Sequence, residues 1–177
     1  NPEGPGIVEL NADEFFKPLK LPSRHQSIKP GSYGETTEPV SIAFKSIIEL
    51  AVSVFASLLT NQLQTIVSWG PLRITLDDKG YVAFYCDDVK FITSKQPIIV
   101  AKWYTISIEI WKDQETVLCI HNQMTGLEEQ TYKKNAKLGI NLDEFESAKI
   151  RVATDKGKTE FFNGKIEAPE IKVDGKT

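Results

Sequence analysis

The sequence contains little cysteine and little histidine, with two of each among 177 residues. Cys86 and Cys119 lie 33 positions apart (119 − 86) in strand-like runs. A bridge between two sheets and a pair of buried thiols in a reducing compartment both remain open, and the second is favoured. His25 and His121 have no further Cys or His at ligand spacing, so we expect no metal centre built on them.

Long apolar runs and an excess of positive charge are also absent. The longest apolar run, 47–59, is interrupted by Glu49, Ser53 and Ser57, whereas a membrane helix requires about 20 mostly apolar residues. The formal net charge is −3, and no basic stripe is present that would neutralise a phosphate backbone. We therefore expect neither a membrane nor a nucleic acid as a partner.

The chain also lacks an Asn-x-Ser/Thr glycosylation acceptor and an apolar signal-like segment at its start. Both absences favour a cytoplasmic location. Because the chain opens with Asn1 rather than Met, we expect it to be a fragment of a longer protein. The opening is rich in Gly and Pro, which predicts a covering N-terminal extension over residues 1–22, followed by one domain at 23–177.

The clearest positive signal is alternation of apolar and polar residues. From Tyr104 to Ile110 every second residue is apolar, and the residues between them are mostly polar, which predicts a half-buried strand. The polar run 112–115 predicts a turn, and Leu118 and Ile120 share one face of a following strand. Residues 103–122 therefore predict an antiparallel hairpin.

Many further segments show strand-like patterns separated by turn residues. Run 47–59 also fits a helical period, but its β-branched residues favour a strand. Turn 77–80 ends in Gly80, which we expect at positive φ. About a dozen short strands at this spacing predict an all-β, two-sheet antiparallel β-sandwich of jelly-roll type. The predicted strands outside the hairpin are 7–10, 24–28, 32–36, 47–59, 64–69, 72–76, 81–86, 89–93, 148–153 and 168–173.

The order of four motifs resembles the laminin G-like branch of the concanavalin A-like jelly rolls. These motifs are GYVAF at 80–84, WYTIS at 103–107, VLCI at 117–120 and FNGKIEAP at 162–169. The last motif, together with SRHQSIKPGSY at 23–33, resembles the N-terminal lectin-like domain of N,N-dimethylformamidase large-subunit-type proteins. One departure is that 51–56 lacks the Trp usual in this segment.

This resemblance implies a non-catalytic accessory or interaction domain of a larger N,N-dimethylformamidase-like amidohydrolase. The catalytic domain of such proteins, with its iron-binding residues, lies further along the chain and has no counterpart here. The implied partner is the protein's own downstream catalytic domain or another subunit. The alternative is a carbohydrate-binding, lectin-like module.

Catalytic constellations are absent from the sequence pattern. Related jelly rolls include glycoside hydrolases, which place paired carboxylates on one strand as E-x-D-x-E. The acidic runs 128–129 and 143–146 lack this spacing, and Glu109 has no second acid in phase. A nucleophilic site would need Ser or Cys beside His and an acid, and Cys119 near His121 is better explained as a pair of buried neighbours. We therefore expect no catalytic residues, and the chain is not an enzyme by itself.

The candidate ligand-binding residues are Trp111, Tyr85, Asn122 and Asp87. Trp111 occupies the polar phase of its strand, where a ring can stack on a sugar, and the other three would complete one patch with it. The alternative is that Trp111 covers a strand edge, or that the hairpin tip contacts a protein partner.

Four Asp residues flank one hairpin and offer oxygen ligands for calcium, as in some laminin G relatives. Turn formation explains them equally well, so we expect no cofactor, with calcium as the alternative. They are Asp77, Asp78, Asp87 and Asp88.

Overall fold

The fold is taken from a computed structural model of the chain. The structure describes residues 7–10, 33–38, 46–112, 115–123, 129–134, 148–155, 157 and 159–174. The strand predicted at 24–28, the acidic run 143–146 and most of the motif at 23–33 lie outside these residues. So do His25 and nearly all of the predicted extension, except Ile7–Leu10.

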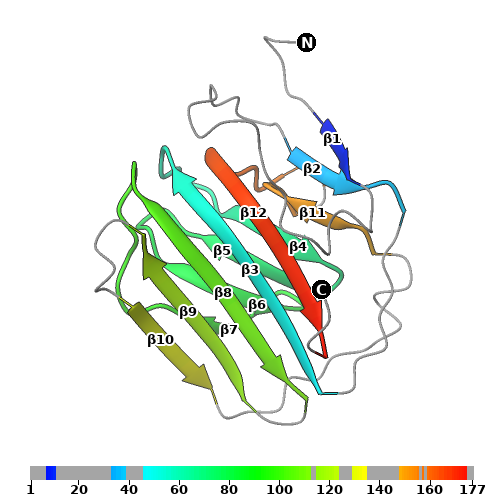
Figure 1. Ribbon diagram of the computed structural model, residues 1–177. Coiled ribbons are helices and arrows are strands. Elements are labelled where there is room, and N and C mark those ends of the chain that lie inside the picture. The colour runs from blue at the N-terminus through cyan, green and yellow to red at the C-terminus, as the bar shows by residue number, and fades with distance from the viewer. Residues whose placement is uncertain are drawn as a thin grey trace.

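Two sheets face each other (Figure 1). The seven-stranded sheet has the order β1-β2-β11-β4-β5-β6-β7, and the five-stranded sheet has the order β10-β9-β8-β3-β12. All pairs are antiparallel except β1 with β2. The predicted all-β sandwich is confirmed.

The strands of the first sheet are β1 (Ile7–Leu10), β2 (Tyr33–Thr36), β4 (Gln64–Trp69), β5 (Leu72–Leu76), β6 (Val82–Cys86), β7 (Val89–Thr93) and β11 (Ile150–Val152). Those of the second are β3 (Ile47–Ala56), β8 (Trp103–Trp111), β9 (Thr116–Asn122), β10 (Glu129–Lys134) and β12 (Gly164–Val173).

The predicted hairpin forms the centre of the five-stranded sheet as β8 and β9. Burial alternates strictly along β3, and along β8 from Trp103 to Ile110, so each strand turns every second side chain inward. Because β3 pairs with β8 on one side and β12 on the other, its backbone polar groups are satisfied as a strand. This pairing decides the helix-or-strand ambiguity of run 47–59.

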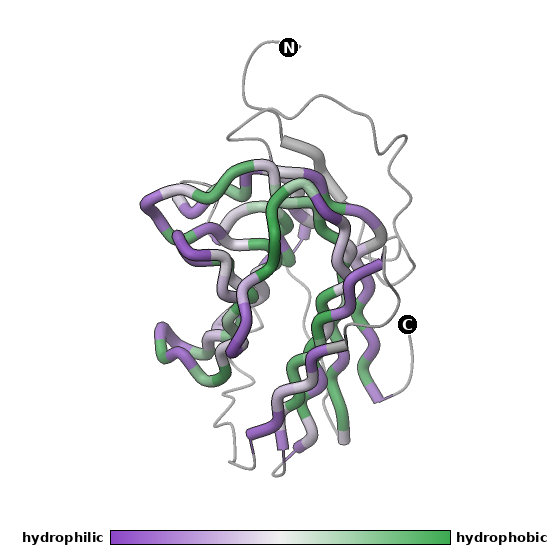
Figure 2. The backbone as a smooth tube through the Cα atoms, turned by 90° about the vertical axis from the view of Figure 1, so that its left-hand side faces the viewer, coloured by the Kyte–Doolittle hydropathy of each residue, from purple (hydrophilic) through white to green (hydrophobic). Residues whose placement is uncertain are grey.

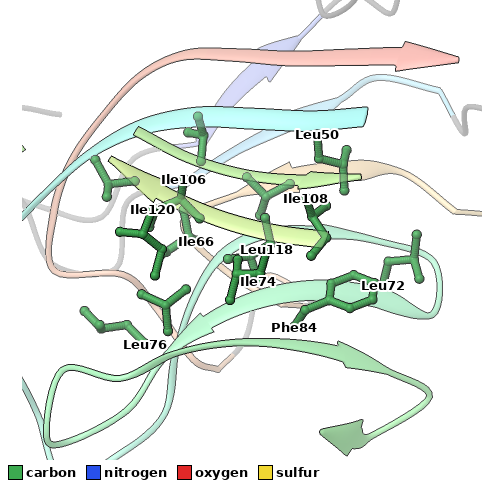
Figure 3. Packing of buried hydrophobic residues seen from close by; sticks show 14 of the residues in the cluster. Leu50, Ile66, Leu72, Ile74, Leu76, Phe84, Ile106, Ile108, Leu118 and Ile120 are labelled. Atoms are coloured by element: carbon green, nitrogen blue, oxygen red, sulfur yellow. The ribbon is translucent and has the colours of Figure 1, made fainter. Parts of the chain in front are cut away.

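The core lies between the two sheets and is almost entirely aliphatic (Figure 3). In the edge-on direction of Figure 2, hydrophobic and hydrophilic residues alternate along the strands of both layers. Burying each such side chain contributes about 1.5–3 kcal/mol, so the apolar phase fixes which face of each sheet points inward. The central residues are Leu50, Ile106, Ile108, Leu118 and Ile120 from one sheet and Ile66, Leu72, Ile74, Leu76 and Phe84 from the other.

Several strands are shorter than predicted, such as β3, which ends at Ala56 instead of 59, and two differ more. β10 was not predicted, because its sequence EQTYKK is polar; it is an edge strand that pairs only with β9. β12 begins at Gly164, four residues before the predicted start at 168. Gly164 resembles a turn residue, but β12 is an edge strand and includes it; a bulge between Glu167 and Glu170 accommodates Pro169, which lies within the predicted strand.

The turns follow their predicted chemistry. Gly80 has φ 93° and closes the β5–β6 turn with a hydrogen bond from its N–H to the Asp77 carbonyl. Asp87 and Asp88 form the β6–β7 turn with φ 49° and 64°, the left-handed pair typical of a two-residue hairpin loop.

Neither cysteine forms a disulfide, so the bridge between sheets is not formed. Cys86 is buried, whereas Cys119 is half-buried and pairs in register with Ser107 and Thr131. Cys119 and His121 therefore lie on the outward face of the five-stranded sheet. The expectation that Cys119 and His121 are a pair of buried neighbours is wrong, because each is only partly buried. None of the described residues belongs to a helix long and apolar enough to cross a membrane.

The motif at 162–169 has a packing explanation. Phe162 and Ile166 are buried, and a Cβ on Gly164 would lie 2.1 Å from the Phe55 carbonyl oxygen and 2.8 Å from the Phe162 ring. Only glycine fits there, since a backbone carbonyl cannot move aside cheaply.

We expect Gly164→Ala to destabilise the domain by about 1–3 kcal/mol or more, because the added methyl group displaces β12 from β3. The free energy of unfolding in urea measures this loss. Ser107→Ala, on the outward face of β8, is the control and should change stability by less than about 0.5 kcal/mol. Equal stabilities of the Gly164 variant and wild type would contradict the packing explanation.

Candidate functional site

The outward face of the seven-stranded sheet carries a continuous row of polar side chains, which we name the outward row. Strand register places one residue from each of six neighbouring strands in line. Their neighbours along the strands, such as Ile150, Leu72 and Phe84, are buried in the core, so the alternation points the row away from it. The outward row consists of Glu35, Arg151, Ser68, Arg73, Tyr85 and Lys90.

A cavity of about 450 Å³ opens over the middle of this row. Gly70 and Pro71, in the β4–β5 turn, form one end of it. Its volume lies within the range of small-molecule sites, about 300–1,000 Å³. We name it the polar groove, because its charged lining residues are Arg73, Lys149, Arg151, Asp87, Asp88 and Asp155.

Arg73 is the most constrained side chain of the polar groove. Its guanidinium lies 4.4 Å from the centre of the Tyr85 ring, and its Nη1 donates to Asp88 Oδ1 at 2.8 Å. Its Nε lies 3.4 Å from Glu160 Oε1, too poorly aligned for a hydrogen bond. With 11% of the side chain exposed, the planar group is held from three sides and is preorganised to donate into the groove.

Arg151 and Lys149 share one carboxylate. Arg151 Nε donates to Glu35 Oε2 at 2.9 Å, and Lys149 Nζ lies 3.9 Å from Glu35 Oε1. The groove lining thus contains three cations and three carboxylates. Because Glu35 and Glu160 stand behind them, no positive charge in the lining is left without a nearby carboxylate.

Non-glycine residues in the left-handed region occur in and beside the polar groove. One wall of the groove is the Asp87–Asp88 turn and the other is at Asp155, after β11; Ala153, two residues before Asp155, has φ 69°, and Glu160, beside Arg73, has φ 55°. Such conformations cost on the order of 1–2 kcal/mol per residue and persist where surrounding contacts impose them, often at ligand sites. Here Ser68 Oγ contacts the carbonyl oxygens of Thr154 and Asp155 at 3.0 and 2.8 Å, and this fixes the second wall.

The structure separates the four residues predicted to form one patch. Trp111 is 37% exposed on the outward face of the five-stranded sheet, where its Nε1 donates to Glu109 Oε2. Asn122 is 3% exposed and pairs with Tyr104, seven residues and about 23 Å from Trp111 along β8. Asp87 lines the polar groove, and Tyr85 lies beneath Arg73. The single patch centred on Trp111 is therefore not formed.

Sequence reasoning missed Arg73, Lys149, Arg151 and Asp155. A signal was present: Arg73 and Arg151 each interrupt a short apolar strand, LRITL and KIRV, where an arginine must point outward. What the sequence did not contain was the pairing of β11 with β4, which brings positions 68 and 151 together.

The four Asp residues considered for calcium do not converge. Asp77 and Asp78 lie at the turn before β6, and Asp87 and Asp88 lie at the turn after it. Among the residues that the structure describes, no three His, Cys, Asp or Glu side chains gather as a metal ion requires.

A second, shallower depression of about 120 Å³ lies on the outward face of the five-stranded sheet. Glu49 and Glu109 stand opposite each other there, a juxtaposition that sequence reasoning did not find. Glu170, in the same depression, is paired with Lys172 at 3.1 Å. The depression is about a quarter of the volume of the polar groove (120 against 450 Å³), so the groove is the better candidate site.

Arg73 forms two ion pairs, and we expect the longer one, with Glu160 at 3.4 Å, to be stronger than the shorter one, with Asp88 at 2.8 Å. Asp88 has 86% of its side chain exposed and Glu160 has 22%, and solvent screens the exposed pair. Double-mutant cycles in urea unfolding, with Arg73→Gln, Asp88→Asn and Glu160→Gln, should give below about 1 kcal/mol for Arg73–Asp88 and about 1–3 kcal/mol for Arg73–Glu160. The reverse order would show that Glu160 does not hold the guanidinium.

Comparison with known proteins identifies the fold. No protein-family model matches the sequence, and no curated protein matches it. Among solved structures, lectin II from Ulex europaeus has a TM-score of 0.54 at 9% identity, covering 88% of this chain and 85% of the lectin. A putative carbohydrate binding protein from Bacteroides ovatus has a TM-score of 0.57 at 12% identity, covering 88% of this chain and 43% of that protein. Arcelin-5, a lectin-like defense protein from Phaseolus vulgaris, has a TM-score of 0.50 at 8% identity, covering 80% of each chain.

At these identities the likeness extends to the fold alone. It agrees with the predicted concanavalin A-like architecture, whereas the comparisons give no support to the resemblance to N,N-dimethylformamidase. The chain therefore has the two-sheet sandwich fold of the lectin-like, concanavalin A-like proteins.

Proposed function

We propose that this domain is a carbohydrate-binding, lectin-like module, and that the polar groove is its ligand site. The observation that carries the proposal is that three cationic donors and three carboxylate acceptors line one cavity of about 450 Å³. A sugar hydroxyl donates one hydrogen bond and accepts two, so neighbouring hydroxyls are matched by neighbouring guanidinium and carboxylate groups. Hydrogen bonds to charged groups are the strong ones.

The solved structures of the same fold support this choice of ligand class. One is described as a putative carbohydrate binding protein, and another is a Ulex europaeus lectin in complex with galactose, with a TM-score of 0.53 at 8% identity. These descriptions apply to those proteins and not to this chain. They support the proposal because a protein with this two-sheet fold is found in complex with a sugar.

The polar groove would bind by hydrogen bonding rather than by ring stacking. Tyr85, the aromatic residue of the outward row, has its face covered by the Arg73 guanidinium. Trp111 presents a more exposed ring, but it stands on the opposite sheet, where the depression lined by described residues has a volume of only about 120 Å³. We propose that the module acts without catalysis and without a resident cofactor.

A second proposal is that the module is an accessory domain of a larger amidohydrolase and packs against its catalytic domain or another subunit. One observation favours a protein contact: Leu58, Ile99 and Val100 are exposed apolar residues. Leu58 follows the end of β3, Ile99 and Val100 precede the start of β8, and a hydrogen bond from the Ala101 N–H to the Ala56 carbonyl brings the two connections to the same end of the sheet. The N,N-dimethylformamidase resemblance itself rests on two motifs, of which that at 162–169 is explained by packing around Gly164.

Binding to a glycan array tests the first proposal. We expect wild type to bind at least one oligosaccharide, and Arg73→Lys to weaken that binding by about tenfold or more, because lysine keeps the charge but loses the planar donor fork. Trp111→Ala is the matched control and should bind within about twofold of wild type. Loss of binding in the Trp111 variant, with Arg73→Lys unchanged, would instead place the site on the five-stranded sheet.

A further inference from the structure

We propose that the polar groove selects uncharged saccharides, and that the Asp87–Asp88 turn is the element that excludes anionic ones. This inference rests on the proposed function and names the ligand class of the same site. Without this turn the groove lining would hold Arg73, Lys149 and Arg151 against a single carboxylate, Asp155. Three clustered cations at one cavity are what recognition of carboxylate, sulfate or phosphate groups requires.

The turn removes that excess. Asp87 and Asp88 both line the groove, and they bring the lining from three cations and one carboxylate to three of each. Asp88 Oδ1 also accepts a hydrogen bond from Arg73 Nη1 at 2.8 Å. A carboxylate of the protein is therefore already bound to the guanidinium group that an anionic ligand would contact. An anionic saccharide would have to displace it and would meet Asp87 and Asp155 nearby, at a cost of about 1 kcal/mol or more for each like charge.

The fold does not require charge at these two positions. Both residues have positive φ, 49° and 64°, and asparagine and glycine adopt this conformation at least as readily as aspartate. Two adjacent carboxylates repel each other, which slightly disfavours the turn. The Asp88 side chain is 86% exposed, so its ion pair with Arg73 adds little stability. We therefore attribute to the two carboxylates of the turn an effect on ligand selection, namely the exclusion of anionic saccharides from the groove.

Among the residues that the structure describes, the remaining charged groups near the groove do not restore a positive field. Lys90 continues the outward row beyond Tyr85, but Glu35 and Glu160 stand behind Arg151 and Arg73. When Lys90, Glu35 and Glu160 are added to the six charged lining residues, the groove and its surroundings contain four cations and five carboxylates. Binding of a neutral sugar should therefore release few counterions and depend little on salt.

The test uses the charge-neutralising double variant Asp87→Asn/Asp88→Asn, which keeps residues that tolerate the left-handed turn. The control is Asp78→Asn, an exposed residue of the β5–β6 turn at the other end of β6. Each protein is titrated with the neutral oligosaccharides of the array and with heparin and polygalacturonate, at about 20 mM and about 500 mM NaCl. Thermal unfolding checks that all three proteins are folded.

We expect wild type and the control to bind a neutral oligosaccharide, with less than about a twofold change between the two salt concentrations, and to leave both polyanions unbound. The double variant should bind heparin at least about tenfold more tightly than wild type at low salt, and lose this binding at high salt. Polyanion binding by wild type, or no gain in the double variant, would overturn this inference while leaving a carbohydrate-binding function intact. Absence of binding to every saccharide would overturn the proposed function and this inference with it.

Discussion

Antiparallel register with a period of two is the constraint on which the rest of the structure depends. Each strand between two neighbours turns one set of side chains into the aliphatic core, and the other set must then face outward. The outward row is thus the reverse side of the core: Ser68, Arg73 and Tyr85 stand in line because the neighbouring row of Trp69, Leu72 and Cys86 is buried. A slip of one residue in β5 would exchange the two sets and place Arg73 in the core, at a cost of several kcal/mol.

The sheet alone would give a flat polar surface, and the connections turn it into a groove. The Asp87–Asp88 turn lines one side of the groove, and Asp155, in the connection after β11, lines the other. The second wall is tied to the sheet through Ser68 Oγ and through the hydrogen bond from Thr65 Oγ1 to Glu160. A rigid sheet that carries donors, with two constrained walls that carry acceptors, is a geometry that needs little rearrangement to bind a polyhydroxylated ligand.

Sequence reasoning predicted the strands and the sandwich well, because alternation and turn residues are local signals. It placed β3, β8 and β9 correctly and anticipated the positive φ of Gly80. It missed β10, whose polar sequence has no apolar phase, and it began β12 late because Asn163-Gly164 resembles a turn. The site was harder to find, since Arg151 joins Arg73 and Asp88 only through the pairing of β11 with β4, two strands far apart in the chain. Of the four predicted ligand residues, Asp87 lies in the groove and Tyr85 supports it, whereas Trp111 and Asn122 are elsewhere.

The central claim is that ligands enter over the seven-stranded sheet between Arg73 and Arg151. The most direct measurement is a nuclear magnetic resonance titration of the labelled protein with an oligosaccharide that binds, following backbone amides and arginine Nε–H groups. The account predicts shifts at Ser68, Arg73, Asp88 and Arg151, with the indole N–H of Trp111 unchanged. Chemical-shift changes confined to Trp111 and the outward face of β3 and β8, with the arginine Nε–H signals unchanged, would contradict it.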